Sequence, residues 1–219
     1  MLENNLQTIF NLIKDGNNLG EPITLVAATK TVPVDVINRS IELGVKVVGD
    51  NKVQEFNEKS PFIKNASFHF IGHLQKNKVK YLVGKVDLIH SVDSISLAEE
   101  IDRISDKKGV CTNILLEVNI GKEESKSGFS EDELIPAFNE IQKLKSVNVL
   151  GLMAMLPKTD DLELKKNLCL QMRSLYDTIN EKHKLTYLSL GMSEDYLVAI
   201  QNGSNMIRLG SSIYGKRNY

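Results

Sequence analysis

The segment Ile23-Thr24-Leu25-Val26-Ala27-Ala28-Thr29-Lys30 is an apolar run that ends in a lysine. It is too short for a buried helix and Pro33 follows closely, so it predicts a buried β-strand over Thr24–Lys30. A lysine at the carboxyl end of such a strand meets apolar walls, which disfavour a charged ammonium and favour a nucleophilic amine. Taken alone, the segment favours a simpler interpretation, in which Lys30 extends its charged end to the surface. The rest of the chain reverses this preference.

Short apolar runs alternate with amphipathic segments along the whole chain. The segments predicted as strands are Thr24–Lys30, Lys46–Asp50, Ser67–Gly72, Leu88–Val92, Asn113–Ile120, Val149–Met155, Tyr187–Gly191 and Met206–Leu209. The segments predicted as helices between them are Val34–Leu43, Asn51–Lys59, Gln75–Val83, Ser96–Asp106, Glu131–Leu144, Asp161–Lys182 and Glu194–Gln201. This alternation predicts a single α/β domain over residues 1–219, a (β/α)₈ TIM barrel preceded by an extra helix over Leu2–Ile13. An open doubly wound sheet is the alternative, but no GxGxxG motif follows the first strand.

The composition is that of a globular protein without a charge bias. Hydrophobic residues make up 42% of the 219 residues and charged residues 25%, which is enough for a sizeable core. The net charge of −1 gives no electrostatic basis for binding nucleic acid or an anionic membrane. There is no apolar run of membrane-spanning length and no secretory signal, and Cys111 and Cys169 form no CxxC motif. We therefore expect a cytoplasmic protein with reduced thiols.

Polar residues follow the predicted strands, where the active site of a TIM barrel lies. These residues are Lys30, Asp50, Asn51, Gly72, His73, Ser91, Asp93, Asn119, Ser193 and the run Arg208–Ser212. A lysine at this face indicates Schiff-base chemistry, either with a substrate carbonyl or with pyridoxal phosphate.

The last two strand ends offer donors for a phosphate group. Gly191-Met192-Ser193 opens a predicted helix, and Arg208-Leu209-Gly210-Ser211 closes the eighth strand. Backbone N–H groups and serine hydroxyls suit a phosphate, and the loops after strands seven and eight are the usual phosphate site of this fold. Separately, Ser193 fits ordinary helix capping and Gly210 an ordinary turn. Together with Lys30, they favour a phosphate site.

Other chemistries find less support in the sequence. His69 and His73 lie on a predicted strand and turn, and no third ligand has metal spacing, so no metal site is predicted. No G-x-S-x-G motif accompanies His90, which argues against a hydrolase triad. The segment Gly121–Gly128 is not a Walker loop. Its charge density suggests an exposed loop over the barrel mouth, and an ordinary solvated surface loop is the simpler interpretation.

Several segments carry a family resemblance when they are taken together. They are Ala28–Thr31, Gly49–Glu55, Phe68–Lys78, Val118–Ile120, Ser125–Gly128, Gly151–Met155, Ser189–Ser193, Arg208–Ser211 and Ile213–Arg217. The set resembles the pyridoxal-phosphate homeostasis protein family, whose fold is similar to the N-terminal barrel of alanine racemase. Two departures are visible, because Asp50 stands where the family usually has glutamate and Ser211 where it usually has threonine. The shorter Asp50 changes the reach of this carboxylate, whereas Ser211 keeps the hydroxyl that phosphate binding needs.

The resemblance implies a binding site for pyridoxal 5′-phosphate. Lys30 would hold the cofactor covalently as a Schiff base, and Asn51 would line its ring. The phosphate would be held by Ser193, Gly210 and Ser211.

Arg208 would approach the pyridine nitrogen, as in racemase-like barrels. A carboxylate at that place keeps the ring nitrogen protonated, whereas an arginine cannot, so the electron-withdrawing power of the ring is muted. In alanine racemase a second base comes from a further domain, and this chain ends at Tyr219, directly after the barrel. We therefore expect a protein that buffers pyridoxal phosphate in the cell without robust turnover, and no catalytic residue is assigned.

The sequence leaves several alternatives open. A weak racemase or transaminase that uses pyridoxal phosphate would need the same lysine. A cofactor-free Schiff-base aldolase would also need it, whereas an interaction scaffold would leave the clustering at the strand ends unexplained. As partners we expect pyridoxal phosphate and, transiently, the apo-enzymes that require it, with the chain acting as a monomer or a weak dimer.

Overall fold

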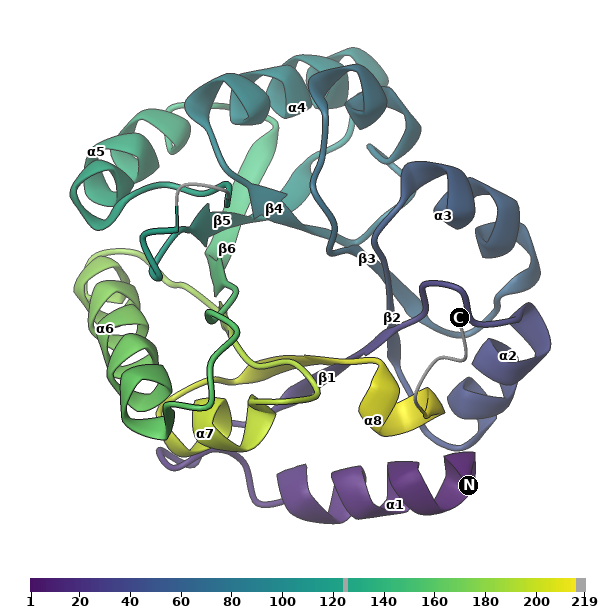
Figure 1. Cartoon of the computed structure of the whole chain (residues 1–219). Helices are drawn as coiled ribbons and strands as arrows, with labels where there is room; N and C mark the ends of the chain where they lie inside the picture. Colours follow the sequence, from purple (N-terminus) through teal and green to yellow (C-terminus); the bar gives the residue numbers. More distant parts are fainter. Residues whose placement is uncertain (124–125, 216–219) are drawn as a thin grey trace.

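The first and last strands of the chain pair with each other and close the sheet into a barrel. In the computed structural model, which describes residues 1–123 and 126–215, β1 (Thr24–Ala28) is parallel to both β2 (Val47–Asp50) and β8 (Met206–Leu209). The strands follow the chain order around the barrel, from β1 to β8 (Figure 1). The remaining strands are β3 (Ser67–Phe70), β4 (Leu88–Val92), β5 (Thr112–Val118), β6 (Val147–Ala154) and β7 (Tyr187–Ser189). The predicted (β/α)₈ TIM barrel is thus confirmed.

Helices surround the barrel (Figure 1); α2 to α7 connect consecutive strands, whereas α1 precedes β1 and α8 follows β8. They are α1 (Leu2–Ile13), α2 (Val34–Glu42), α3 (Val53–Lys59), α4 (Ile95–Lys108), α5 (Glu131–Ile141), α6 (Leu162–Asn180), α7 (Tyr196–Gln201) and α8 (Ser211–Tyr214). Side chains that satisfy free backbone groups fix several of their limits. In α4 the Ser94 hydroxyl accepts from Leu97 N, and Gly109 ends the helix in a left-handed conformation. No helix in the described part of the chain is long and apolar enough to cross a bilayer.

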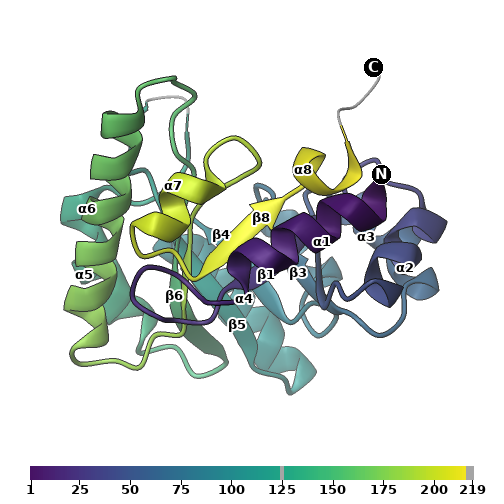
Figure 2. The same ribbon diagram turned by 90° about the horizontal axis from the view of Figure 1, so that it is seen from below.

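The predicted helix α1 is confirmed, and it covers a gap in the outer layer. The neighbouring helices α7 and α8 are short, with six and four residues, and α1 packs beside α8 and α2 (Figure 2). It buries Leu6 and Ile9 against the barrel, and Asn5 Nδ2 donates to Ile213 O at 2.9 Å. Full burial of side chains of this size contributes about 1.5–3 kcal/mol each.

The first strand ends earlier than the sequence predicts. β1 ends at Ala28, so Lys30 lies in the turn that follows the strand. Thr29 N still donates to Gly49 O at 2.9 Å, but Thr31 adopts a left-handed conformation with φ 64°, which no strand can continue. The amine of Lys30 is therefore presented from a turn at the carboxyl end of β1.

Three short helices also differ from the expectation. The segment Gln75–Val83, predicted as an α-helix, contains the 3₁₀ helix η2 (Lys76–Tyr81). A 3₁₀ helix rises about 2 Å per residue against about 1.5 Å in an α-helix, so it spans more of the barrel height with the short chain between β3 and β4. A second 3₁₀ turn, η1 (Ser60–Phe62), follows α3 and was not predicted, nor was α8.

The barrel interior is apolar in its middle and polar toward the carboxyl ends of the strands. The apolar cluster consists of Val26, Leu88, Leu115, Met153 and Met206. Side chains two residues further along a strand face the same side. The interior positions above this cluster are therefore taken by His90, Glu117 and Arg208, and this polar layer is the floor of the barrel mouth.

Candidate functional site

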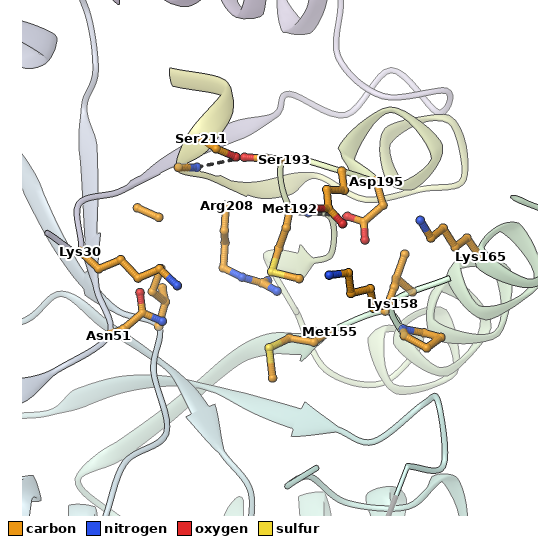
Figure 3. Close-up of a pocket in the computed structure, with 16 residues that line it drawn as sticks. Lys30, Asn51, Met155, Lys158, Lys165, Met192, Ser193, Asp195, Arg208 and Ser211 are labelled. Atoms are coloured by element: carbon orange, nitrogen blue, oxygen red, sulfur yellow. Dashed lines mark hydrogen bonds between the residues drawn. The ribbon is translucent and has the colours of Figure 1, made fainter. Parts of the chain in front are cut away.

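All of the cofactor-binding residues predicted from the sequence line one cavity at the barrel mouth. They are Lys30, Asn51, Ser193, Arg208, Gly210 and Ser211. The cavity has a volume of about 340 Å³, and Lys158, Lys165 and Met192 also line it (Figure 3). Residues from the ends of β1, β2, β7 and β8 are thus brought together, as the strand-end pattern predicts.

The turn that carries Lys30 is held on both sides by helix α3. Lys59 Nζ donates to Thr29 O at 3.0 Å, and Thr31 N donates to a carboxylate oxygen of Glu55. Glu55 and Lys59 also form an ion pair with each other. The left-handed Thr31 is therefore fixed by hydrogen bonds, and the base of the Lys30 side chain has a defined position.

Asp50, one of the two departures from the family pattern, faces this turn and does not line the cavity. Its side chain is buried, and Thr29 Oγ1 donates to Asp50 Oδ1 at 2.8 Å. Burial raises the pKa of Asp50 above its ordinary value, and the Thr29 hydrogen bond works in the opposite direction. The shorter carboxylate thus anchors the residue before Lys30.

Asn51 lines the cavity with an unsatisfied oxygen. Its Oδ1 is buried and accepts no hydrogen bond from the described residues. A buried acceptor without a donor costs about 1–3 kcal/mol, so such groups are rare outside functional sites. The position calls for a hydrogen-bond donor supplied by a ligand.

The corner between the ends of β7 and β8 has the donors that a phosphate needs. Ser193 Oγ accepts hydrogen bonds from Gly210 N and Ser212 N, each at 3.2 Å. A hydroxyl can accept two hydrogen bonds and donate one, so the Ser193 proton is free to point into the cavity. Figure 3 shows Ser211 beside this bonded group, with Lys30 and Asn51 at another side of the cavity.

Glycine is required at the turn that brings Ser193 into this corner. Gly191 has φ 94°, and a Cβ atom there would lie 2.8 Å from both the Cβ of Ala199 and the Cα of Tyr196. A larger residue would push α7 away from the end of β7. The turn is further closed by Met192 N, which donates to Asp195 Oδ1 at 2.6 Å.

Arg208 extends from β8 into the floor of the cavity. The residue is only 5% exposed, and its Nη1 donates to Ser189 O at 2.9 Å and to Ser189 Oγ at 2.6 Å. Its Nη2 donates to Ala154 O at 3.0 Å. Burial lowers the pKa of Arg208 to about 10, while Glu117 and Asp195 oppose this change. The guanidinium therefore stays charged at neutral pH and is held in one orientation.

A chain of hydrogen bonds continues from Arg208 into the barrel. Because a guanidinium only donates, Ser189 Oγ accepts from it and has its own proton to offer to His90 Nδ1, 3.3 Å away. His90 Nε2 lies 3.0 Å from His69 Nδ1, and the tautomers of the two rings decide which nitrogen donates. Burial lowers the pKa of His69 to about 4 and that of His90 well below 6.5, so both rings are neutral at pH 7. Arg208 is thereby linked through Ser189 to two neutral imidazoles.

Sequence reasoning missed Ser189 and Glu117, and it considered His69 and His90 only for metal binding or hydrolysis. A signal for them exists in the sequence, because each of these side chains lies two residues from an apolar residue of the barrel interior. The pairs are Ser189 with Tyr187, Glu117 with Leu115, His90 with Leu88 and His69 with Ile71. Recognising this signal requires knowing which face of each strand points into the barrel.

Lys126 and Ser127 of the predicted mouth loop line a neighbouring cavity. Residues 124–125 of that loop and residues 216–219 of the C-terminal motif lie outside the described residues.

Comparison with known proteins gives a consistent result over almost the whole chain. The family model of the alanine racemase N-terminal domain matches residues 3–218. The pyridoxal phosphate homeostasis protein of Aquifex aeolicus is 42% identical over 199 residues, which is 89% of this chain and 87% of that protein.

Solved structures agree with this assignment. PipY of Synechococcus elongatus PCC7942, with PLP bound, superposes with a TM-score of 0.87 at 28% identity, over 98% of this chain and all of that one. Alanine racemase of Clostridium difficile 630 is 15% identical with a TM-score of 0.83, and this chain covers 57% of it, so the likeness shows the fold alone. The chain belongs to the pyridoxal phosphate homeostasis protein family, built on the barrel of the alanine racemase N-terminal domain.

Proposed function

We propose that this protein binds pyridoxal 5′-phosphate covalently through Lys30 and serves the intracellular homeostasis of this cofactor, without robust turnover of a substrate. The observation that carries the proposal is the convergence of Lys30, Asn51, Arg208 and the Ser193 corner on one cavity. PipY, with PLP bound, and the curated relatives named for pyridoxal phosphate homeostasis support it.

The residues of the cavity fit the chemical groups of the cofactor. The unsatisfied Oδ1 of Asn51 suits the ring hydroxyl, which can donate to it. Ser193 and Ser211 offer hydroxyl protons to the phosphate, and Gly210 keeps that corner free of a side chain. When bound, the cofactor supplies an electrophilic aldehyde carbon that a primary amine can attack.

Arg208 is the main argument for a carrier over an enzyme. Its guanidinium donates hydrogen bonds and is still charged at neutral pH, so it can only donate toward the ring nitrogen and leaves that nitrogen without a proton. An unprotonated ring is a weak electron sink, which disfavours the carbanion chemistry of racemases and transaminases. We include in the proposal a cytoplasmic location, a monomeric or weakly dimeric state and transient delivery of the cofactor to apo-enzymes.

An absorbance spectrum of the purified protein tests the proposal, before and after borohydride, with peptide mapping of the product. We expect a visible band that disappears on reduction and a stable pyridoxyl adduct on Lys30. The Lys30→Ala variant should lose both signals, whereas Lys158→Ala, which removes another lysine of the same cavity, should keep them. A colourless protein that takes up no added pyridoxal phosphate would contradict the proposal, and amino-acid turnover lost in Lys30→Ala would make the protein an enzyme.

A further inference from the structure

A second cavity adjoins the first one at the barrel mouth. Ile71 and Met155 line both cavities and form the boundary between them. The second cavity has a volume of about 370 Å³, and its polar lining comes from His73, Ser91, Glu117, Lys126 and Ser127. None of these residues belongs to the predicted cofactor site.

Glu117 is the buried charged group of this second cavity. It lies on β5, two residues after Leu115 of the interior apolar cluster, so its side chain faces the barrel interior. The residue is only 4% exposed, and no hydrogen bond or ion pair from the described residues reaches its carboxylate, whose oxygens are open to the cavity. A largely desolvated carboxylate without a protein donor is stabilised when a cation with N–H donors binds to it.

No cationic side chain among the described residues forms an ion pair with Glu117. Arg208 attracts it from β8, but the three hydrogen bonds that Arg208 makes go to Ser189 and Ala154 and none reaches Glu117. Asp93, which follows β4, repels it.

The other basic side chains that line the cavity have carboxylate partners of their own. Lys126 Nζ lies 2.7 Å from Glu123 Oε1, and His73 Nδ1 lies 3.6 Å from Asp93 Oδ2. Burial, followed by repulsion from Asp93, raises the pKa of Glu117 to about 7. The cavity therefore holds an excess of carboxylate over free cation at and above neutral pH.

We propose that the second cavity binds the ammonium group of a primary amine, with the Glu117 carboxylate as its main acceptor. An ammonium group donates three hydrogen bonds, and the hydroxyl of Ser91 offers a second acceptor on the cavity wall. The choice of a primary amine rests on the proposed function, because the cofactor carbon that Lys30 would hold in the neighbouring cavity reacts with primary amines, which displace the Lys30 amine. The bound ammonium group must first lose a proton, and the Glu117 carboxylate is placed to accept it. The site would position such an amine beside the cofactor.

Two sources of a primary ammonium group fit this chemistry, and they can be separated. One is the side chain of a lysine on another protein, represented by n-butylammonium. The other is a free amino acid, represented by L-alanine, whose own carboxylate would lie near Glu117 and Asp93. We expect n-butylammonium to bind more tightly, because L-alanine brings this repulsion with it. The reverse order would assign the cavity to free amino acids.

The experiment uses protein treated with borohydride, so that an added amine cannot react with a bound cofactor. The mass of the treated protein reports whether a cofactor was present, which tests the proposed function separately from amine binding. Calorimetry with n-butylammonium should give binding at pH 8 that is about tenfold weaker in Glu117→Gln, since the neutral amide loses the ionic part of the interaction. The matched control is Glu163→Gln, which removes an exposed carboxylate on α6 that lines neither cavity. It should bind n-butylammonium as the wild type does.

A titration of the Glu117 carboxyl carbon by NMR gives a second readout in the wild type. Saturating n-butylammonium should lower the midpoint by about one pH unit, since the bound cation stabilises the carboxylate. Affinity should fall about tenfold in total between pH 8 and pH 5, as the carboxylate takes up a proton, and should then level off. An unchanged midpoint would overturn the proposal, as would equal affinity of Glu117→Gln. The same midpoint shift with an equal concentration of potassium would identify a monovalent-cation site instead.

Discussion

The two sides of the barrel mouth hold buried charges in different ways. On the β7–β8 side, Arg208 makes three hydrogen bonds to Ser189 and Ala154, and its charge is fixed in place. On the β4–β5 side, Glu117 is as deeply buried but has no hydrogen-bond partner among the described residues. Arg208 is thus held by protein groups alone, whereas the Glu117 carboxylate is largely desolvated without a protein donor and is stabilised by a cation or a proton.

This difference has a thermodynamic meaning. A buried charge with its hydrogen bonds made contributes to the cohesion of the core, and removing it leaves its partners unsatisfied. A buried charge without partners opposes folding, so removing it stabilises the protein. Substitutions on the two sides should therefore change the free energy of unfolding with opposite signs.

The largest effect is expected for Arg208→Ala. The substitution leaves Ser189 O, Ser189 Oγ and Ala154 O without their donor and removes the cation that attracts Glu117. We expect a loss of about 3–5 kcal/mol in the free energy of unfolding, measured by urea denaturation at pH 7. The exposed Arg103→Ala should leave the stability unchanged. If Arg208→Ala lost as little unfolding free energy as Arg103→Ala, the hydrogen bonds of Arg208 would not stabilise the β7–β8 side of the mouth.

An effect of opposite sign is expected for Glu117→Gln, and it should depend on pH. The folded pKa of Glu117 is raised from 4.5 to about 7, so the stability that comes from its proton is fully present below pH 4.5. That stability is lost as the pH rises to 7, because the unfolded chain gives up this proton first. Glutamine removes the ionisation, so the variant should be up to about 3 kcal/mol more stable than the wild type at pH 8.

Urea denaturation at pH 4 and pH 8 checks this prediction. The stabilisation should vanish at pH 4, where the wild-type carboxyl is neutral in both states. Glu194→Gln, which changes an exposed carboxylate, serves as the control and should show no such dependence. Equal stability of wild type and Glu117→Gln at both pH values would mean that Glu117 already has a partner.

The sequence predicts the two sides of the mouth unequally well. Lys30, Ser193 and Gly210 follow strands directly, and strand ends are visible as the places where apolar runs stop. The family resemblance adds Asn51 and Arg208. The structure brings all of these residues to one cavity.

Glu117, by contrast, lies inside a predicted strand, where a single polar residue is easily taken for a solvent-facing position. Its inward direction follows from the alternation of side chains along β5, but the sequence alone does not say which of the two faces is the interior. The neighbouring strand adds an irregularity, because β6 pairs Val149 with Ile114 and Gly151 with Leu115 and so has a bulge at Leu150. Neither the bulge nor the hydrogen bonds that join Ser189, His90 and His69 can be derived from the order of residues alone.

The smallest change in the free energy of unfolding is expected for Ser189→Ala, which removes a single oxygen atom on the β7–β8 side of the mouth. Ser189→Ala removes the hydroxyl between Arg208 and His90 but keeps the carbonyl that accepts from Arg208 at 2.9 Å. His90 Nδ1 is then left as a buried acceptor without a donor, which should cost about 1–3 kcal/mol in urea denaturation. The exposed Ser96→Ala is the matched control.

A double-mutant cycle decides whether this cost comes from the chain of hydrogen bonds. If it does, His90→Ala should cost less in the Ser189→Ala background than in the wild type, with a coupling of about 0.5–3 kcal/mol. Strictly additive losses would mean that Ser189 and His90 act independently through packing. The orientation of Arg208 would then depend on the two backbone carbonyls of Ser189 and Ala154. The β7–β8 side of the mouth would be ordered by the barrel backbone and not by its interior side chains.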